Sequence, residues 1–168
     1  ELPDCTYLTS PVNGDTGVII EADIIWAAVS DATGYKLLAG YSPGGAELLD
    51  SLNVGNVNTY DLGTLPYDTL VYITVFPYND MGQKIGCFEE SFRTQIPPPN
   101  CSNLISPMPG SINIEVDSGI VWQAATGAPL GYKLNIGTNP GGTQILDNFN
   151  VDDTLNYNPS PWPYDSTI

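Results

Sequence analysis

Apolar and polar residues alternate over short stretches of this chain, and turn-forming residues separate the stretches. Side chains two positions apart on a strand share one face, so such alternation predicts strands with one buried face. Three sets of apolar residues have this spacing: Ile24, Trp26 and Ala28; Tyr35, Leu37 and Ala39; and Val71, Ile73 and Val75. No long stretch follows the 3.6-residue period of a helix, so we expect an all-β fold.

The same pattern predicts a series of short strands in the first half of the chain. They are Thr6–Ser10, Gly17–Glu21, Asp23–Ala28, Tyr35–Ser42, Glu47–Asn53, Thr59–Leu62, Leu70–Tyr78 and Cys87–Thr94. Ser42-Pro43-Gly44-Gly45 predicts a turn, because proline fixes φ at one corner and glycine accepts a positive φ at the next.

The chain also contains an internal repeat. When Cys5 is placed on Cys101, Trp26 falls on Trp122, and one extra residue near position 129 then places Gly34–Leu37 on Gly131–Leu134. The matches continue at Pro43-Gly44-Gly45 with Pro140-Gly141-Gly142, at Asn53-Val54 with Asn150-Val151, and at Pro66-Tyr67-Asp68 with Pro163-Tyr164-Asp165. Agreement this long with a single gap indicates two copies of one module.

Three consecutive prolines separate the copies. We expect modules at 1–96 and 100–168 joined by Pro97-Pro98-Pro99, a stiff spacer that would set the modules end to end. Ile168 corresponds to Val71, so the second copy has no counterpart of Tyr72–Thr94. We therefore expect a second sandwich that lacks its last strands. Either the chain is a fragment of a longer protein, or another chain supplies the strands and builds a filament.

A module of this length with about seven short strands and one early tryptophan fits an immunoglobulin-like sandwich. Trp26, then Gly34–Leu37, then Val71–Tyr78 with Asn79 and Gly82 resembles the fibronectin type III pattern. The wider series is similar to tandem repeats of large secreted or surface proteins of flavobacteria and other Bacteroidetes: Cys5, Ser10-Pro11, Gly14, Pro43-Gly44-Gly45, Pro77-Tyr78-Asn79, Gly86-Cys87 and Glu89–Phe92. This resemblance implies two tandem fibronectin type III-like sandwiches at the bacterial cell surface.

The three cysteines follow from that arrangement. In such a sandwich the first strand starts at the same pole as the last, so Cys5 and Cys87 are expected to form a disulfide. Cys101 is then unpaired, or paired outside this chain. Disulfides suit an extracellular compartment, and the start at Glu1 suggests that a targeting segment has been removed.

Composition excludes several classes of function. The chain of 168 residues carries 19 acidic and 4 basic residues, a net charge of −15, and no histidine. Such a surface repels nucleic acid and anionic lipid, and no apolar run approaches the roughly 20 residues of a membrane-spanning helix. We therefore expect no nucleic acid partner and no membrane insertion.

No residue set predicts catalysis or a resident metal. Glu89-Glu90 and Asp152-Asp153 are adjacent carboxylates, which point to opposite faces of a strand and cannot flank one bond. The Pro-Gly-Gly segments lack the lysine and the helix of a phosphate-binding loop. Clusters of Asp and Asn at Asp50–Asp61 and Asp147–Asn158 are compatible with calcium or simply with turns, and we expect no cofactor.

Four Asp-Ser or Asp-Thr pairs resemble the O-glycosylation sequence of Bacteroidetes secreted proteins, with hydroxyls at Ser51, Thr69, Thr154 and Ser166. Alternatively, the aspartates stabilise turns. We expect a non-enzymatic spacer, stalk or adhesive unit whose partners are neighbouring repeats or filament subunits. The alternative is a module that binds a glycan or protein through its strand-connecting loops, with Tyr7, Tyr41, Tyr67 and Tyr78 as candidate contacts.

Overall fold

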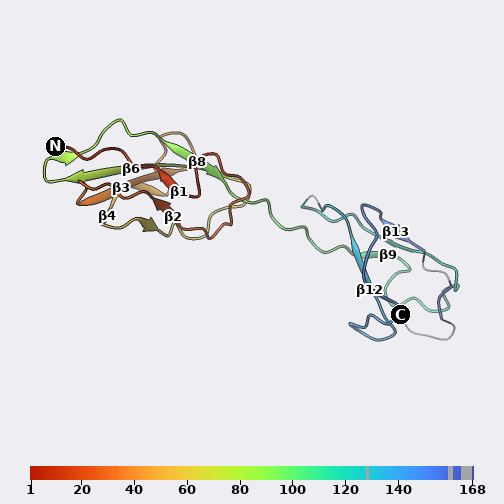
Figure 1. Ribbon diagram of the computed structural model, residues 1–168. Helices are drawn as coiled ribbons and strands as arrows, with labels where there is room; N and C mark the ends of the chain where they lie inside the picture. The colour runs from red at the N-terminus through yellow and green to blue at the C-terminus, as the bar shows by residue number, and fades with distance from the viewer. Residues whose placement is uncertain (128, 159–160, 164–167) are drawn as a thin grey trace. The chain divides into compact units, whose positions relative to one another are not determined.

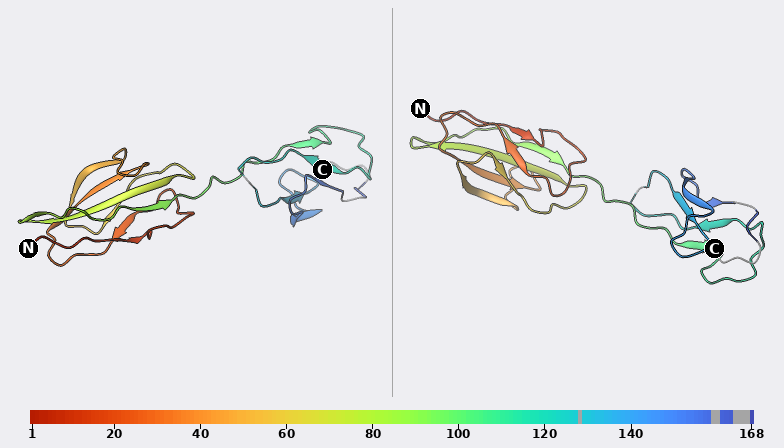
Figure 2. Two further views of the ribbon diagram at one scale, coloured as in Figure 1. Left: turned by 90° about the horizontal axis from the view of Figure 1, so that it is seen from above. Right: turned by 60° about the horizontal axis from the view of Figure 1, so that its bottom comes forward.

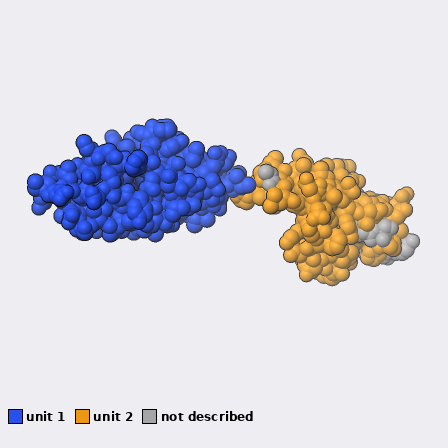
Figure 3. All heavy atoms as spheres, turned by 45° about the horizontal axis from the view of Figure 1, so that its top comes forward, with its two compact units in different colours: residues 1–97 blue, residues 98–168 orange. Residues whose placement is uncertain are grey.

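A computed structural model of the chain describes residues 1–127, 129–158, 161–163 and 168. It divides into two compact units, Glu1–Pro97 (unit 1) and Pro98–Ile168 (unit 2), shown in Figure 3. The described residues form strands, turns and irregular segments but no helix, so the chain is all-β, as the alternation predicts.

Unit 1 is a sandwich of two sheets (Figures 1 and 2). The first sheet has the order β1-β2-β5, with β1 Leu8–Ser10, β2 Ile24–Trp26 and β5 Thr59–Tyr60. The second has the order β4-β3-β6-β7, and β8 also pairs with β6; its strands are β3 Gly34–Gly40, β4 Leu49–Gly55, β6 Leu70–Asn79, β7 Gly82–Gln83 and β8 Glu90–Arg93. These pairs are antiparallel.

The core of unit 1 lies between these two sheets. Ile24 and Trp26 project from the first sheet, and the two alternating sets of β3 and β6 project from the second, each residue at most 4% exposed. The rings of Trp26 and Tyr35 meet edge to face with centroids 5.6 Å apart. The Tyr35 hydroxyl accepts a hydrogen bond from the Val29 N–H at 2.9 Å, so this buried phenol is satisfied.

Three local predictions for unit 1 are wrong. Ala28 is exposed, because β2 ends at Trp26 and the alternation does not continue. Gly17–Glu21 is not a strand: Val18 makes one isolated parallel bridge to Thr94, and the Ala22 N–H then donates to the Ile19 carbonyl in a turn. The last strand begins at Glu90 rather than Cys87, and the short strand β7 was not foreseen.

Unit 2 repeats the first five elements of unit 1. Its first sheet has the order β13-β10-β9, with β9 Leu104–Ser106, β10 Ile120–Trp122 and β13 Asn156–Tyr157. Its second sheet contains β11 Lys133–Ile136 and β12 Leu146–Asn150. Ser10–Pro11 and Ser106–Pro107 are cis at matching positions. Trp122 and Tyr132 repeat the edge-to-face contact, with centroids 5.7 Å apart.

The second sheet is where the units differ. In unit 1, β3 is flanked by β4 on one side and β6 on the other. In the described part of unit 2, the equivalent strand β11 pairs with β12 alone. Leu104 is 40% exposed, whereas its counterpart Leu8 is 2% exposed. Among the described residues of unit 2, no strand covers the face that β6 covers in unit 1.

Candidate functional site

A groove of about 810 Å³ lies between the two sheets of unit 2. One wall is the continuous run 131–137, which contains β11. The other wall comes from the facing sheet and includes Leu104, Ile120 and Trp122. The groove is therefore the space between two apolar sheet faces, bounded on one side by a strand edge that no described strand occupies.

Trp162 also lines the groove and is half-buried. By the repeat it corresponds to Leu65, which is 2% exposed in the core of unit 1. The Trp162 N–H donates to the Val116 carbonyl at 2.7 Å, as the Leu65 N–H does to the Ile20 carbonyl at 2.8 Å. The Trp162 indole N–H donates to the Ser118 carbonyl at 2.6 Å, which fixes the ring at the groove.

Two groove residues, Ser102 and Trp122, each carry a polar atom with no partner among the described residues. The Ser102 hydroxyl is shielded from solvent and unbonded. Its counterpart in unit 1, Thr6, donates its hydroxyl hydrogen to the Ala27 carbonyl. The indole N–H groups of Trp26 and Trp122 are unpartnered in both units, so they do not distinguish the groove.

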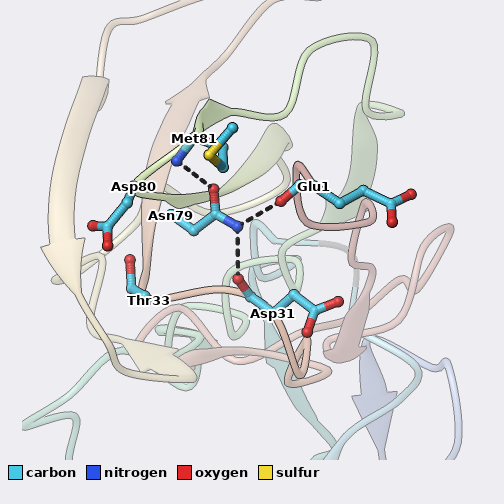
Figure 4. A pocket seen from close by; sticks show the side chains of 6 residues that line it. All are labelled: Glu1, Asp31, Thr33, Asn79, Asp80 and Met81. Carbon is cyan, nitrogen blue, oxygen red and sulfur yellow. Dashed lines mark hydrogen bonds between the residues drawn. The ribbon is translucent and has the colours of Figure 1, made fainter.

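A second hollow, of about 470 Å³, lies among the strand-connecting loops of unit 1 (Figure 4). The Asn79 amide nitrogen donates to the carbonyls of Glu1 at 2.8 Å and Asp31 at 3.1 Å, and its oxygen accepts from the Met81 N–H at 2.9 Å. Asn79 thus ties three segments together, and its polar atoms are occupied by the fold. No sequence pattern predicted this role for Asn79.

The predicted disulfide between Cys5 and Cys87 is present, with the two Cα atoms 5.4 Å apart. It joins the segment before β1 to the segment before β8, so these two segments lie at the same end of unit 1, as expected. Cys101 is exposed and unpaired within the described chain, and it lines the groove of unit 2.

The four candidate glycosylation residues differ in environment. Ser51 is exposed and has a φ of 49°, and Thr154 is exposed but donates its hydroxyl to the Val151 carbonyl at 2.8 Å. Thr69 is half-buried and donates to the Tyr67 carbonyl at 2.9 Å. Ser166 lies outside the described residues. The hydroxyls of Thr69 and Thr154 are thus engaged in local hydrogen bonds, whereas no such bond is made by Ser51 within the described part of the chain.

Glu89 lies just before β8 and Glu90 is its first residue, and the two carboxylates have different partners. Glu89 accepts the Gly44 N–H at 2.6 Å, and Glu90 accepts the Leu8 N–H at 2.7 Å, which bridges the two sheets. Partial burial raises the pKa of Glu90, while the Leu8 hydrogen bond acts in the opposite direction. Asp152 and Asp153 are both exposed, and Asp152 accepts from the Asn150 amide at 2.8 Å.

The Pro-Gly-Gly segments are turns in both units. The Gly45 N–H donates to the Ser42 carbonyl at 2.8 Å, and the Gly142 N–H to the Asn139 carbonyl at 2.9 Å. Glu47 closes the first turn by accepting from the Tyr41 N–H at 3.0 Å. Hydrogen bonds from its own N–H, from the Tyr41 N–H and from the Ser42 hydroxyl lower the pKa of Glu47. Gln144 makes the equivalent contact with the Thr138 N–H at 3.1 Å.

In the cluster at Asp50–Asp61, which could have suggested a calcium site, polar side chains stabilise turns. Asn53 accepts from the Gly55 N–H at 2.9 Å, and Asp61 accepts from the Gly63 N–H at 2.7 Å. Across the described residues, no three Asp, Glu or Cys side chains gather closely enough to hold a metal ion.

The candidate tyrosines do not form one line. Tyr78 pairs with Gly34 at one end of β3, and Tyr72 pairs with Gly40 at the other end, next to Tyr41. Tyr41 and Tyr78 therefore lie at opposite ends of the sheet. Tyr7 and Tyr67 are 62% and 39% exposed. The Tyr78 hydroxyl donates to Asn53 at 3.0 Å, which indicates a structural role for this ring.

Comparison with known proteins adds no assignment: no family model matches the chain, and no curated protein is significantly similar to it. Within the described residues, no helix has the length and apolar character needed to cross a membrane.

Proposed function

We propose that the chain is a non-enzymatic structural module pair of an extracellular protein, which spaces or presents other domains. The observation that carries this proposal is the covalent closure of unit 1. The disulfide ties residues 82 positions apart, and the core between them is formed by two apolar sheet faces. Carboxylates and glycines that could have suggested a catalytic or binding site make local contacts instead. Glu47 accepts a hydrogen bond from Tyr41, Glu89 from Gly44 and Asp61 from Gly63.

An extracellular location is supported by the disulfide, since such bonds persist mainly in oxidising compartments. The net charge of −15 keeps neighbouring copies apart, which suits a densely displayed surface protein. The resemblance to bacterial surface repeats agrees with both points.

Labelling of intact cells tests this proposal. An antibody raised against the 168-residue chain should label unpermeabilised cells of the source organism. Labelling that appears only after permeabilisation would overturn an extracellular role. The binding alternative is tested on a glycan array: a spacer gives no saturable signal, whereas a glycan-binding module gives one that is lost when Tyr7 and Tyr67 are replaced by alanine.

We further propose that Ser51 and Thr154, the two exposed candidates, are O-glycosylated in the native organism. Among the described residues the Ser51 hydroxyl makes no hydrogen bond, so it is the stronger site. Peptide mass spectrometry of native protein should find hexose-type mass on these hydroxyls. Unmodified Ser51 and Thr154 in native material would refute the proposal, and the S51A and T154A variants serve as matched controls.

A further inference from the structure

The two sheets of unit 1 end in edge strands of very different length. An edge strand presents unpaired N–H and C=O groups, which can pair with a strand of another molecule. β1, β5 and β7 have three residues or fewer. β4 has seven residues, pairs with β3, and has no described strand on its other side (Figure 1). β4 is therefore the edge with the greatest capacity to pair with another chain.

The remaining edge strand, β8, is covered by the chain itself. In addition to its pairing with β6, β8 exchanges backbone hydrogen bonds with the segment that follows β1. The Gly14 N–H donates to the Ser91 carbonyl at 2.7 Å, and the Val18 N–H donates to the Arg93 carbonyl at 3.1 Å. The Arg93 N–H donates to the Asp15 carbonyl at 2.7 Å. Short length or cover thus protects the other edges of unit 1, and neither protects β4.

The backbone of β4 is interrupted near its centre. Leu37 pairs with Leu52 and Ala39 pairs with Leu49, so two residues of β4 oppose one residue of β3. One of the two is Ser51, whose φ of 49° lies in the left-handed region that residues other than glycine rarely adopt. This arrangement is a β-bulge, which bends the strand and increases its local twist. The outer edge of β4 is therefore not straight.

Unit 2 has the same bulge at the matching position. In β12 two residues again oppose one residue of the partner strand, and the pairing shifts between Leu134 and Ile136. By the repeat, Ser51 corresponds to Asn148, which has a φ of 52°. Because serine and asparagine differ in chemistry, the two copies share the backbone conformation at this position rather than a function of the side chain.

A straight β4 would favour association between copies of the chain. Leu52 is 40% exposed, and Asp50 is the only charged residue of the strand. Long edges of this composition pair readily with other edges. The net charge of −15 opposes the approach of two copies, but salt screens this repulsion beyond about 8 Å at physiological ionic strength. Protection at contact distance therefore requires a local feature of the edge.

We propose that the bulge at Ser51 is this feature: it prevents β4 from pairing with the β4 edge of a second copy of the chain. The bulge divides the seven residues of the strand into two shorter runs, which a partner strand cannot follow in one register. Asn148 has the same role in β12. This inference goes beyond the proposed spacer role and does not depend on it.

The experiment deletes Ser51 from the full 168-residue chain. The deletion leaves one residue opposite Leu38 and keeps the flanking pairs, so β4 becomes regular. The matched control is Ser51→Gly, which keeps the extra residue and accepts a positive φ. Hydrogen exchange followed by mass spectrometry reads peptides that cover β4. Between about 10 µM and about 1 mM protein, exchange there should slow at least about tenfold in the deletion variant, and should stay constant in the wild-type chain and in the glycine control.

The outcomes separate a barrier from a local structural role. Adding Leu52→Lys to the deletion variant should restore constant exchange, because a charge on an edge opposes pairing. A folded deletion variant whose β4 exchange does not depend on concentration would overturn the proposal. Association of Ser51→Gly would overturn it as well, since the serine side chain rather than the bulge would then be the barrier.

Loss of protection in β3 and β6 would show that the deletion unfolds unit 1. Ser51→Val then decides by the same criteria, because valine keeps the chain length and strongly disfavours a positive φ. Surface labelling of cells is unaffected by any of these results, so failure here is distinguishable from failure of the extracellular role.

Discussion

Units 1 and 2 share a framework but differ in how well it is covered. Matching strands, matching cis prolines and matching Trp–Tyr contacts occur in both. Yet Leu37 is fully buried whereas its counterpart Leu134 is only half-buried, and Leu8 and Leu104 differ more widely. The same residues in the same local structure thus reach different burial, because β6 and β8 cover them in one unit only. Local sequence sets the strands, and the neighbouring strands set the burial.

The largest expected difference between the units concerns the disulfide. Replacing Cys5 and Cys87 by alanine should destabilise unit 1 by about 4–5 kcal/mol, since the bridge closes a loop with a sequence separation of 82. Hydrogen exchange followed by mass spectrometry of peptides reads each unit separately, and peptides of unit 2 should be unaffected. C101A is the matched control and should alter neither unit. Unchanged protection of unit 1 in the double variant would contradict this prediction.

A matched pair of leucines tests the difference in coverage directly. Leu8→Ala removes a buried side chain and should destabilise unit 1 by about 2–5 kcal/mol. Leu104→Ala removes a side chain that is 40% exposed, so unit 2 should lose no more than about 1 kcal/mol. Urea unfolding monitored by exchange measures both. Equal losses would mean that the groove face is covered in solution.

A smaller effect concerns a turn that the units build from different residues. Gly17 has a φ of 70°, and its counterpart Asn113 has a φ of 57°. Gly17→Ala should cost about 1–2 kcal/mol, because nothing lies within 4 Å of the new Cβ and only the backbone conformation opposes it. Asn113→Gly should change unit 2 by less than about 0.5 kcal/mol, since asparagine tolerates this region. Thermal unfolding of the two variants measures both; a large loss in N113G would show that the Asn113 side chain has another role.

The smallest effect is a dependence of unit 1 on pH. Burial raises the pKa of Glu90, so its contribution to stability is present at low pH and is lost as the pH rises through the folded pKa. Arg93 lowers the pKa of Asp68 through a 2.8 Å ion pair, so that contribution is present at neutral pH and is lost as the pH falls.

E90Q and D68N should therefore move in opposite directions. Between pH 7 and pH 3, the wild-type chain should gain urea stability relative to E90Q and lose it relative to D68N. Both changes should be confined to unit 1. If the stabilities of the two variants relative to wild type changed in the same direction, the directions assigned to the pKa shifts of Glu90 and Asp68 would be contradicted.

The strand arrangement of the sandwich that the chain resembles predicted the Cys5–Cys87 bond. The alternation of apolar residues predicted the all-β class and the buried faces of β3 and β6. It placed a strand at Gly17–Glu21, where the apolar residues were suggestive. In the fold Val18 makes a single bridge to Thr94, and a turn at Ile19–Ala22 ends the pairing. Such interruptions depend on tertiary neighbours and carry no local signal.

The groove was only partly predictable. The repeat predicted the strands that form the two walls of the groove. It also aligned Trp162 with Leu65, but it did not show that the Ser102 hydroxyl would have no hydrogen-bond partner among the described residues.

The bond between Cys5 and Cys87 also limits how far unit 1 can lengthen under tension. A pull applied at Glu1 and Pro97 travels through the sulfur atoms and bypasses the 82 positions between them. Since a fully extended chain spans about 3.3–3.6 Å per residue, roughly 270–300 Å of contour length is withheld while the bond is intact. A reducing environment would release this length, so the same domain would act as a short link when oxidised and as an extensible one when reduced.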